Sequence, residues 1–100
     1  MTSEMKSRLA EAYVHLGLDF LRSGGRDRDA IVALTRGLAM NPPEPEIVYY
    51  TRAVAHEMIG DMQAAYQDYQ AAAAVKPDWA APREQLQRLA ARKQPHAPAG

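Results

Sequence analysis

Hydrophobic residues recur along the chain at the three- and four-residue spacing typical of α-helices, and no segment shows the strict alternation of half-buried strands. Gly and Pro interrupt this pattern at Gly24–Gly25, at Gly60 and at the cluster Pro42, Pro43 and Pro45. The sequence therefore predicts five helices, over about 3–22, 27–40, 44–59, 62–75 and 79–92, with Asp78 as the expected N-cap of the last. The predicted fold class is all-α.

The second pair of predicted helices repeats the first pair. Four residues of the first copy, Ala30, Leu34, Gly37 and Pro42, recur 35 positions later as Ala65, Tyr69, Ala72 and Pro77. Further back, Tyr13, Gly17, Leu18 and Gly24 recur 36 positions later as Tyr49, Ala53, Val54 and Gly60. The turn after Gly24 absorbs the extra residue, so each copy is predicted to be an antiparallel helix pair.

The types of residue that recur explain how such a pair packs. Small residues at Gly17 and Ala53 let the first helix of each pair approach the second, where Ala30 and Ala65 are equally small. The large side chains Phe20, Leu34 and Tyr69 are expected to fill the space beside these close approaches. Each pair then leaves one apolar edge that the next pair buries.

This spaced set resembles the tetratricopeptide repeat. The first copy carries Tyr13, Leu16-Gly17, Phe20, Ala30, Leu34 and Pro42, and the second carries Tyr49, Arg52-Ala53, His56, Ala65, Tyr69 and Pro77. The resemblance implies an α-solenoid with repeat one at about 10–43, repeat two at about 46–77 and a capping helix at about 79–92. Residues 1–93 would form one domain, and residues 94–100 are expected to be a disordered tail.

The second copy departs from the first at two kinds of position. Leu16 and Ala33 of copy one correspond to Arg52 and Asp68 of copy two, so an apolar pair is replaced by opposite charges. We expect Arg52 and Asp68 to form a partly buried salt bridge, the alternative being that water solvates each independently. His56 replaces an aromatic residue, and we expect a neutral, packed imidazole, with a pH switch as the alternative.

Composition and charge narrow the classes of function. The 100 residues include 12 basic and 12 acidic side chains and no cysteine, which gives no electrostatic reason to bind nucleic acid and excludes thiolate chemistry. No apolar run is long enough for a membrane span, and the N-terminus lacks the pattern of a secretory signal. We expect a cytoplasmic protein without membrane insertion; the sequence is equally compatible with a piece of a longer chain.

Nothing in the sequence indicates catalysis, a metal or a cofactor. His15, His56 and His96 lie on different predicted elements, and none has the H-E-x-x-H spacing of a zinc site. The serines have no base near them in the sequence, and "SGGR" does not follow a strand as a phosphate loop would. We therefore expect that the protein is not an enzyme.

The resemblance implies that the first helix of each pair lines a concave face that holds a peptide or a helix. The matching positions predict a partner-binding surface of Val14, Leu18, Leu21, Arg22, Ile47, Tyr50, Val54, Glu57, Met58 and Arg88, with Glu11 beside it. Arg22, Glu57 and Arg88 would be rim charges that set the orientation of the partner. Repeats that grip a terminal carboxylate carry Lys, Asn and Arg here, whereas this face is largely apolar. We therefore expect an amphipathic helix or a hydrophobic peptide as the partner.

Two other uses of this surface remain open at the level of sequence. The segment 1–9 could fold back into the groove, which would make the apolar stripe part of the core. Alternatively the chain could form a homodimer that buries the same surface, since two repeats and a cap are few for a stable array. The Ala-rich helix from Ala64 to Ala74 and the exposed edge of the first helix are candidate surfaces for such a dimer.

Overall fold

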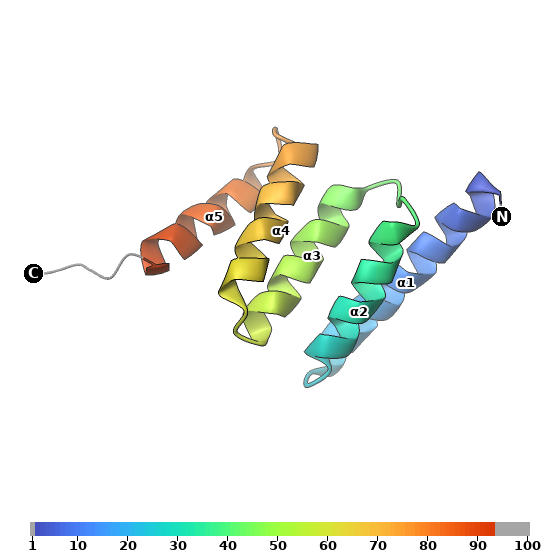
Figure 1. Ribbon diagram of the computed structural model, residues 1–100, viewed down its shortest axis with the longest axis horizontal. Coiled ribbons are helices and arrows are strands. Elements are labelled where there is room, and N and C mark those ends of the chain that lie inside the picture. Colours follow the sequence, from blue (N-terminus) through green and yellow to red (C-terminus); the bar gives the residue numbers. More distant parts are fainter. Residues whose placement is uncertain (1, 94–100) are drawn as a thin grey trace, which may run out of the picture.

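A row of antiparallel helices makes up the computed structural model, which describes residues 2–93 (Figure 1). Over that range the helices are α1 (Ser3–Ser23), α2 (Asp27–Ala39), α3 (Pro45–Met58), α4 (Met62–Val75) and α5 (Ala80–Lys93), and no strand is present. The predicted all-α array of helix pairs is thus confirmed. The tail predicted to be disordered lies outside the described residues.

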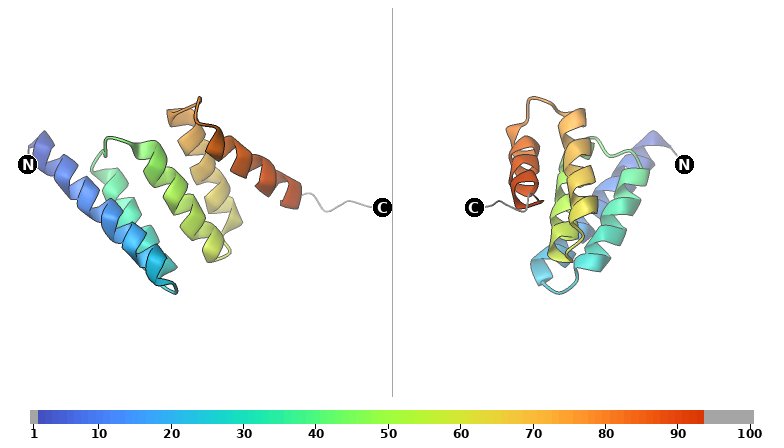
Figure 2. Two further views of the ribbon diagram at one scale, coloured as in Figure 1. Left: turned by 180° about the vertical axis from the view of Figure 1, so that it is seen from behind. Right: turned by 60° about the vertical axis from the view of Figure 1, so that its left-hand side comes forward.

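Each helix packs against its neighbours in the chain, so the array grows in one direction. Figures 1 and 2 show two layers: α2 and α4 lie nearer the viewer in Figure 1, and α1, α3 and α5 lie nearer in the view from behind. The first helix of each pair and the capping helix therefore share one face, which is the face predicted to bind a partner.

The helix ends follow from local hydrogen bonds. The hydroxyl of Thr2 accepts a hydrogen bond from the backbone of Met5, and the carboxylate of Asp61 accepts one from Ala64. At the end of α3, Gly60 has a φ of 84° and donates to the carbonyl of Glu57, as is usual for a helix C-terminus. Asp78 was wrongly expected to be the N-cap of α5, because the helix begins two residues later, at Ala80.

The N-terminal segment does not fold back. Residues from Ser3 onward form the first turns of α1, and α1 projects past the end of the shorter α2 (Figure 1). The described residues of the segment 1–9 therefore leave the concave face open. No helix among residues 2–93 is long and apolar enough to cross a membrane.

Small residues bring the helices of each pair together. A Cβ atom on Gly17 would lie 2.6 Å from Cγ of Leu34, which is fully buried, and 3.4 Å from the carbonyl oxygen of Ala30. In the second pair, Ala53 and Ala65 are fully buried beside Tyr69, and Leu89 of α5 closes this cluster. The repeated small positions thus lie where the sequence predicted close packing.

Replacing Gly17 by valine is expected to lower the free energy of unfolding by about 1–3 kcal/mol, because even its Cβ atom would overlap the fully buried side chain of Leu34. The matched control is Ala12→Val on the exposed side of the same helix, which should cost only about 0.5–0.7 kcal/mol through helix propensity. Urea denaturation measures both. Equal losses in the two variants would contradict close packing at Gly17.

Candidate functional site: the groove between α1 and α3

A cavity of about 160 Å³ lies between α1 and α3. These two helices share one face of the array with α5 (Figure 2). Its apolar lining comes from Val14, Ile47 and Val48, together with prolines of the loop that joins the two helix pairs. The full set of lining residues is Glu11, Val14, His15, Pro42, Pro43, Glu44, Ile47 and Val48. The cavity is wide enough for one apolar side chain of a partner.

Acidic side chains stand at the mouth of this cavity. Glu11 and Glu44 are both exposed and come from opposite sides, one from α1 and one from the loop before α3. Among the residues that the structure describes, no lysine or arginine lines the cavity, and His15 is its only basic group. An apolar floor with an acidic rim favours a ligand that combines an apolar side chain with a cation.

The other half of the predicted surface is largely occupied by α5 and the segment before it. The ring of Tyr50 lies 5.2 Å from that of Tyr69 and 5.1 Å from that of Trp79, measured between centroids. Val54 also packs against the cluster that includes Leu89. Tyr50 and Val54 are therefore half-buried and contribute to the packing of the second helix pair.

Glu57 and Arg88, two of the predicted rim charges, pair with each other and connect α3 to α5. The guanidinium of Arg88 donates to both carboxylate oxygens of Glu57, at 2.8 and 2.7 Å, and the hydroxyl of Tyr69 donates to the same carboxylate at 2.5 Å. Burial alone would raise the pKa of Glu57, but the hydrogen bonds from Arg88 and Tyr69 lower it below its ordinary value. The pair acts as a clasp that holds the capping helix.

The remaining predicted residues are spread along the face. Leu18 and Leu21 are half-buried on α1, and Arg22 is exposed, 3.5 Å from the carboxylate of Asp19. Met58 is 61% exposed at the last position of α3. The structure thus brings Val14 and Ile47 together in one cavity, gathers four others around α5 and places Met58 at the opposite end of α3 from Ile47.

Sequence reasoning missed several residues of the site. His15, Pro43, Glu44 and Val48 line the cavity, and Trp79 covers Tyr50. His15 and Val48 each directly follow a position that was predicted, and this adjacency was the available signal. The contribution of the loop could not be read from helix periodicity, because Pro43 and Glu44 lie outside the helices.

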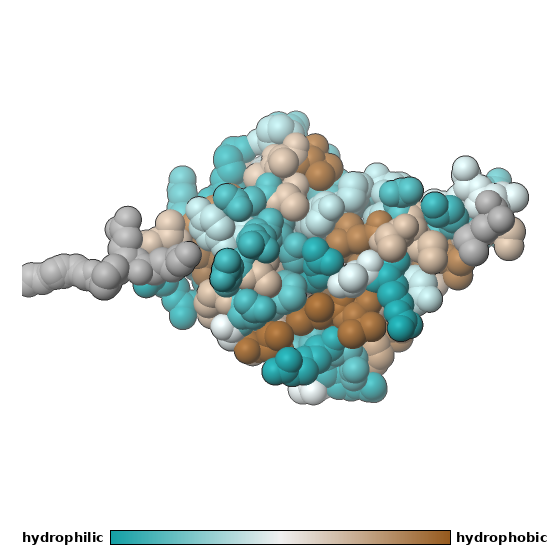
Figure 3. Space-filling view, in the orientation of Figure 1, coloured by the Kyte–Doolittle hydropathy of each residue, from teal (hydrophilic) through white to brown (hydrophobic). Residues whose placement is uncertain are grey.

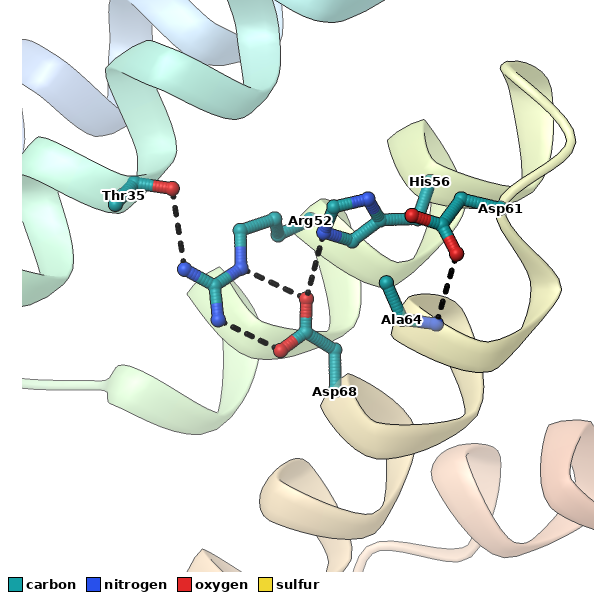
Figure 4. A network of polar contacts seen from close by, with 6 residues as sticks. All are labelled: Thr35, Arg52, His56, Asp61, Ala64 and Asp68. Carbon is teal, nitrogen blue, oxygen red and sulfur yellow. Dashed lines mark hydrogen bonds and ion pairs between the residues drawn. The ribbon is translucent and has the colours of Figure 1, made fainter.

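A second cluster of polar side chains lies at the junction of the two repeats (Figure 4). Arg52 donates from Nε and Nη2 to the two oxygens of Asp68, each at 2.7 Å, and from Nη1 to the hydroxyl of Thr35 on α2, at 3.1 Å. The Asp68 side chain is only 7% exposed. The expected salt bridge is therefore present, and it also ties the second repeat to the first.

His56 completes this cluster. Its Nε2 atom lies 3.5 Å from the carboxylate of Asp68, and its Nδ1 atom is buried without a hydrogen-bond partner among the described residues. The imidazole is packed between α3 and α4 as expected (Figure 4). Over the described residues, no group of three potential metal ligands comes together here or elsewhere.

Comparison of the chain with protein-family models, with curated proteins and with solved structures gives no match.

Removing both partners of the Arg52–Asp68 pair should cost less than the sum of the losses from removing each partner alone. Arg52→Leu leaves the buried Asp68 carboxylate without its cation and is expected to cost about 3 kcal/mol. The double variant with Asp68→Ala recreates the apolar pair found at Leu16 and Ala33. It should lose about 1–3 kcal/mol less than the sum of the two single changes in a denaturation cycle. Additive losses would refute the pairing.

The clasp between Glu57 and Arg88 predicts a dependence of stability on pH. Because the folded-state pKa of Glu57 lies below its ordinary value of 4.5, the contribution is present above that value and is lost as the pH falls through the lower, folded pKa. The difference in unfolding free energy between wild type and Glu57→Gln should therefore shrink below about pH 4.5. Glu84→Gln, at an exposed position of α5, is the matched control and should show no such trend.

Proposed function

We propose that this chain is a protein-interaction domain of the tetratricopeptide repeat type, and that the groove between α1 and α3 binds a peptide or a helix of another protein. The main support is the cavity itself: an apolar floor opens on the shared face of α1 and α3, and no other described segment fills it. We propose that the protein is an adaptor rather than an enzyme. We also propose that it is located in the cytoplasm, because a chain without cysteine does not need an oxidising compartment to form disulfides.

The partner is expected to present one apolar side chain to Val14 and Ile47 and a lysine or arginine to Glu11 or Glu44. An amphipathic helix with such neighbours three or four positions apart satisfies both requirements. One cavity of this size supports an affinity in the range of about micromolar rather than nanomolar. The acidic rim would raise the association rate at low salt more than it raises affinity.

Ile47 is a better position than Tyr50 for a substitution that tests binding in the groove. Its side chain is 41% exposed at the cavity, whereas Tyr50 packs between Tyr69 and Trp79. A change at Tyr50 would therefore reduce both the stability of the domain and the binding of a partner, and the two effects could not be separated. Ile47→Ala removes contact area from the groove with little effect on the core.

A library of displayed helical peptides, selected on the wild-type protein, supplies the ligands for the test. Selected peptides should combine an apolar residue with Lys or Arg, and Ile47→Ala should weaken their binding by about 1–2 kcal/mol. The matched control is Val75→Ala, which is 46% exposed on α4 and lies outside the groove. Glu44→Lys should weaken the same peptides and reduce the salt dependence of binding.

Three outcomes would contradict the proposal: no peptide is enriched, the enriched peptides bind Ile47→Ala and Val75→Ala equally, or their binding is insensitive to both Glu11→Lys and Glu44→Lys. The alternative use of this face, burial of the groove in a homodimer, predicts instead that Ile47→Ala changes the mass of the protein measured by light scattering.

A further inference from the structure

A second cavity, of about 240 Å³, lies between α1 and α2 at the N-terminal edge of the array. It is lined by Tyr13, Leu16, Phe20, Asp29, Val32, Ala33 and Arg36, all of which belong to the first repeat. It is separate from the groove, because the two cavities share no lining residue. None of its lining residues comes from α3, so the surface belongs to the outer side of the first helix pair.

The internal repeat shows what kind of surface this is. The offsets of 35 and 36 relate its seven lining residues to Tyr49, Arg52, His56, Ala64, Gln67, Asp68 and Ala71 of the second repeat. In that repeat, Arg52 on α3 reaches across to Thr35 on α2, so the α3 part of this surface faces the preceding helix, whereas Gln67 on α4 is exposed. The equivalent part of the first repeat, on α1, has no preceding helix among the described residues, and the neighbouring surface of α2 is exposed beside it.

At several of these positions, a polar side chain of the second repeat corresponds to an apolar side chain at the open edge of the first. At the internal junction, Arg52, His56 and Asp68 are polar and largely buried. At the open edge, the counterparts of Arg52 and Asp68 are Leu16 and Ala33, and Leu16 is 44% exposed. Val32, which replaces Gln67, is 51% exposed. A terminal repeat that faces only water is expected to be polar on its outer side.

This apolar surface continues along α1. Met5 and Leu9 are both exposed, and their spacing from Leu16 places them on the same side of the helix. Four of the seven exposed large hydrophobic residues found over residues 2–92 therefore lie on this one edge. Figure 3 shows hydrophobic residues gathered over α2 on a face that is otherwise mostly hydrophilic. Exposed apolar residues gathered on one edge in this way mark an interaction site.

The charges on α2 identify the occupant. Asp29, Val32, Ala33 and Arg36 form one stripe, in which the acid precedes Val32 by three residues and the base follows Ala33 by three. A two-fold axis through the middle of this stripe would place Asp29 of one chain beside Arg36 of the other, and would do so twice. The stripe is thus complementary to itself when two copies of α2 run antiparallel.

We propose that the edge formed by α1 and α2 is a homodimer interface, in which α2 packs antiparallel to α2 of a second copy and Leu16 and Val32 are buried. An interface in which the same surface occurs on both partners has this symmetry. The contact leaves the groove between α1 and α3 free, so it differs from a dimer that hides the groove.

The charged groups at this edge are available for such pairing. Asp29 accepts a hydrogen bond from Nε of Arg26 at 3.0 Å, but both side chains are more than half exposed, and such surface pairs contribute little. Arg36 has no hydrogen bond or ion pair to any residue that the structure describes. Arg26 also stacks over Phe20, with its guanidinium carbon 4.4 Å from the ring centre, which keeps the end of the edge covered.

Charge exchange between two chains tests the symmetry directly. Asp29→Arg alone and Arg36→Asp alone each place like charges together at both ends of the stripe. Each should weaken the dimer by about tenfold or more in sedimentation equilibrium. A 1:1 mixture of the two single variants should form a heterodimer, because each chain then offers the charge that the other requires. The double variant should dimerise like the wild type.

Asp19→Arg is the matched control, because Asp19 is an exposed acid on α1 outside the edge cavity, and this variant should dimerise normally. Circular dichroism confirms that each single variant keeps its helices, and Val32→Asp provides an independent disruption of the apolar centre. The proposal is overturned if the wild type is monomeric at the highest concentrations tested or if either single variant dimerises normally. It is also overturned if the mixture fails to associate or if open-ended polymers form. Peptide binding by the monomeric variants is measured separately, so a failure here does not bear on the groove.

Discussion

The close approach of the two helices in each pair is the constraint on which the rest of the structure depends. At Gly17 the backbone of α1 comes so near to Leu34 that even a Cβ atom would collide with that side chain. Ala53 and Ala65 are the equivalent small residues in the second pair, and both are fully buried. Because alanine and glycine side chains bury little area, the close packing of the helices must supply the van der Waals contacts that bulky side chains supply in other proteins.

An array of helix pairs has two edges and internal junctions, and in this chain the side chains at each of these places differ in polarity. The junction between the repeats is bound by Arg52, which joins Asp68 to Thr35, so that specificity comes from hydrogen bonds. The C-terminal edge is capped by α5 through the clasp of Glu57 and Arg88. The N-terminal edge alone presents Leu16 and Val32 to the outside. The junction inside the array is therefore held by hydrogen bonds between charged groups, whereas the N-terminal edge exposes apolar side chains.

The duplication in the sequence predicted the parts of the structure that repeat. It located four helices and the small residues between them, and the substitution of Leu16 and Ala33 by Arg52 and Asp68 predicted a salt bridge between helices that are distant in sequence. The duplication could not predict the features that occur in only one copy. Trp79 and Arg88 have no counterpart in an earlier copy, so the sequence did not reveal that they would cover Tyr50 and pair with Glu57. Part of the predicted surface therefore also contacts α5 and the segment before it, which the sequence did not indicate.

The two candidate surfaces lie on different sides of the first helix pair, and this arrangement has a physical consequence. A dimer formed through α2 would carry two grooves, each between α1 and α3 of its own chain. A partner with two matching segments would then engage the second groove as an intramolecular step, at an effective concentration set by the linker between the segments. Weak grooves of about micromolar affinity would in this way give tight binding, without any larger cavity than the 160 Å³ that each chain offers. Self-association at one edge and modest affinity at the groove are therefore compatible properties of a chain as small as this one.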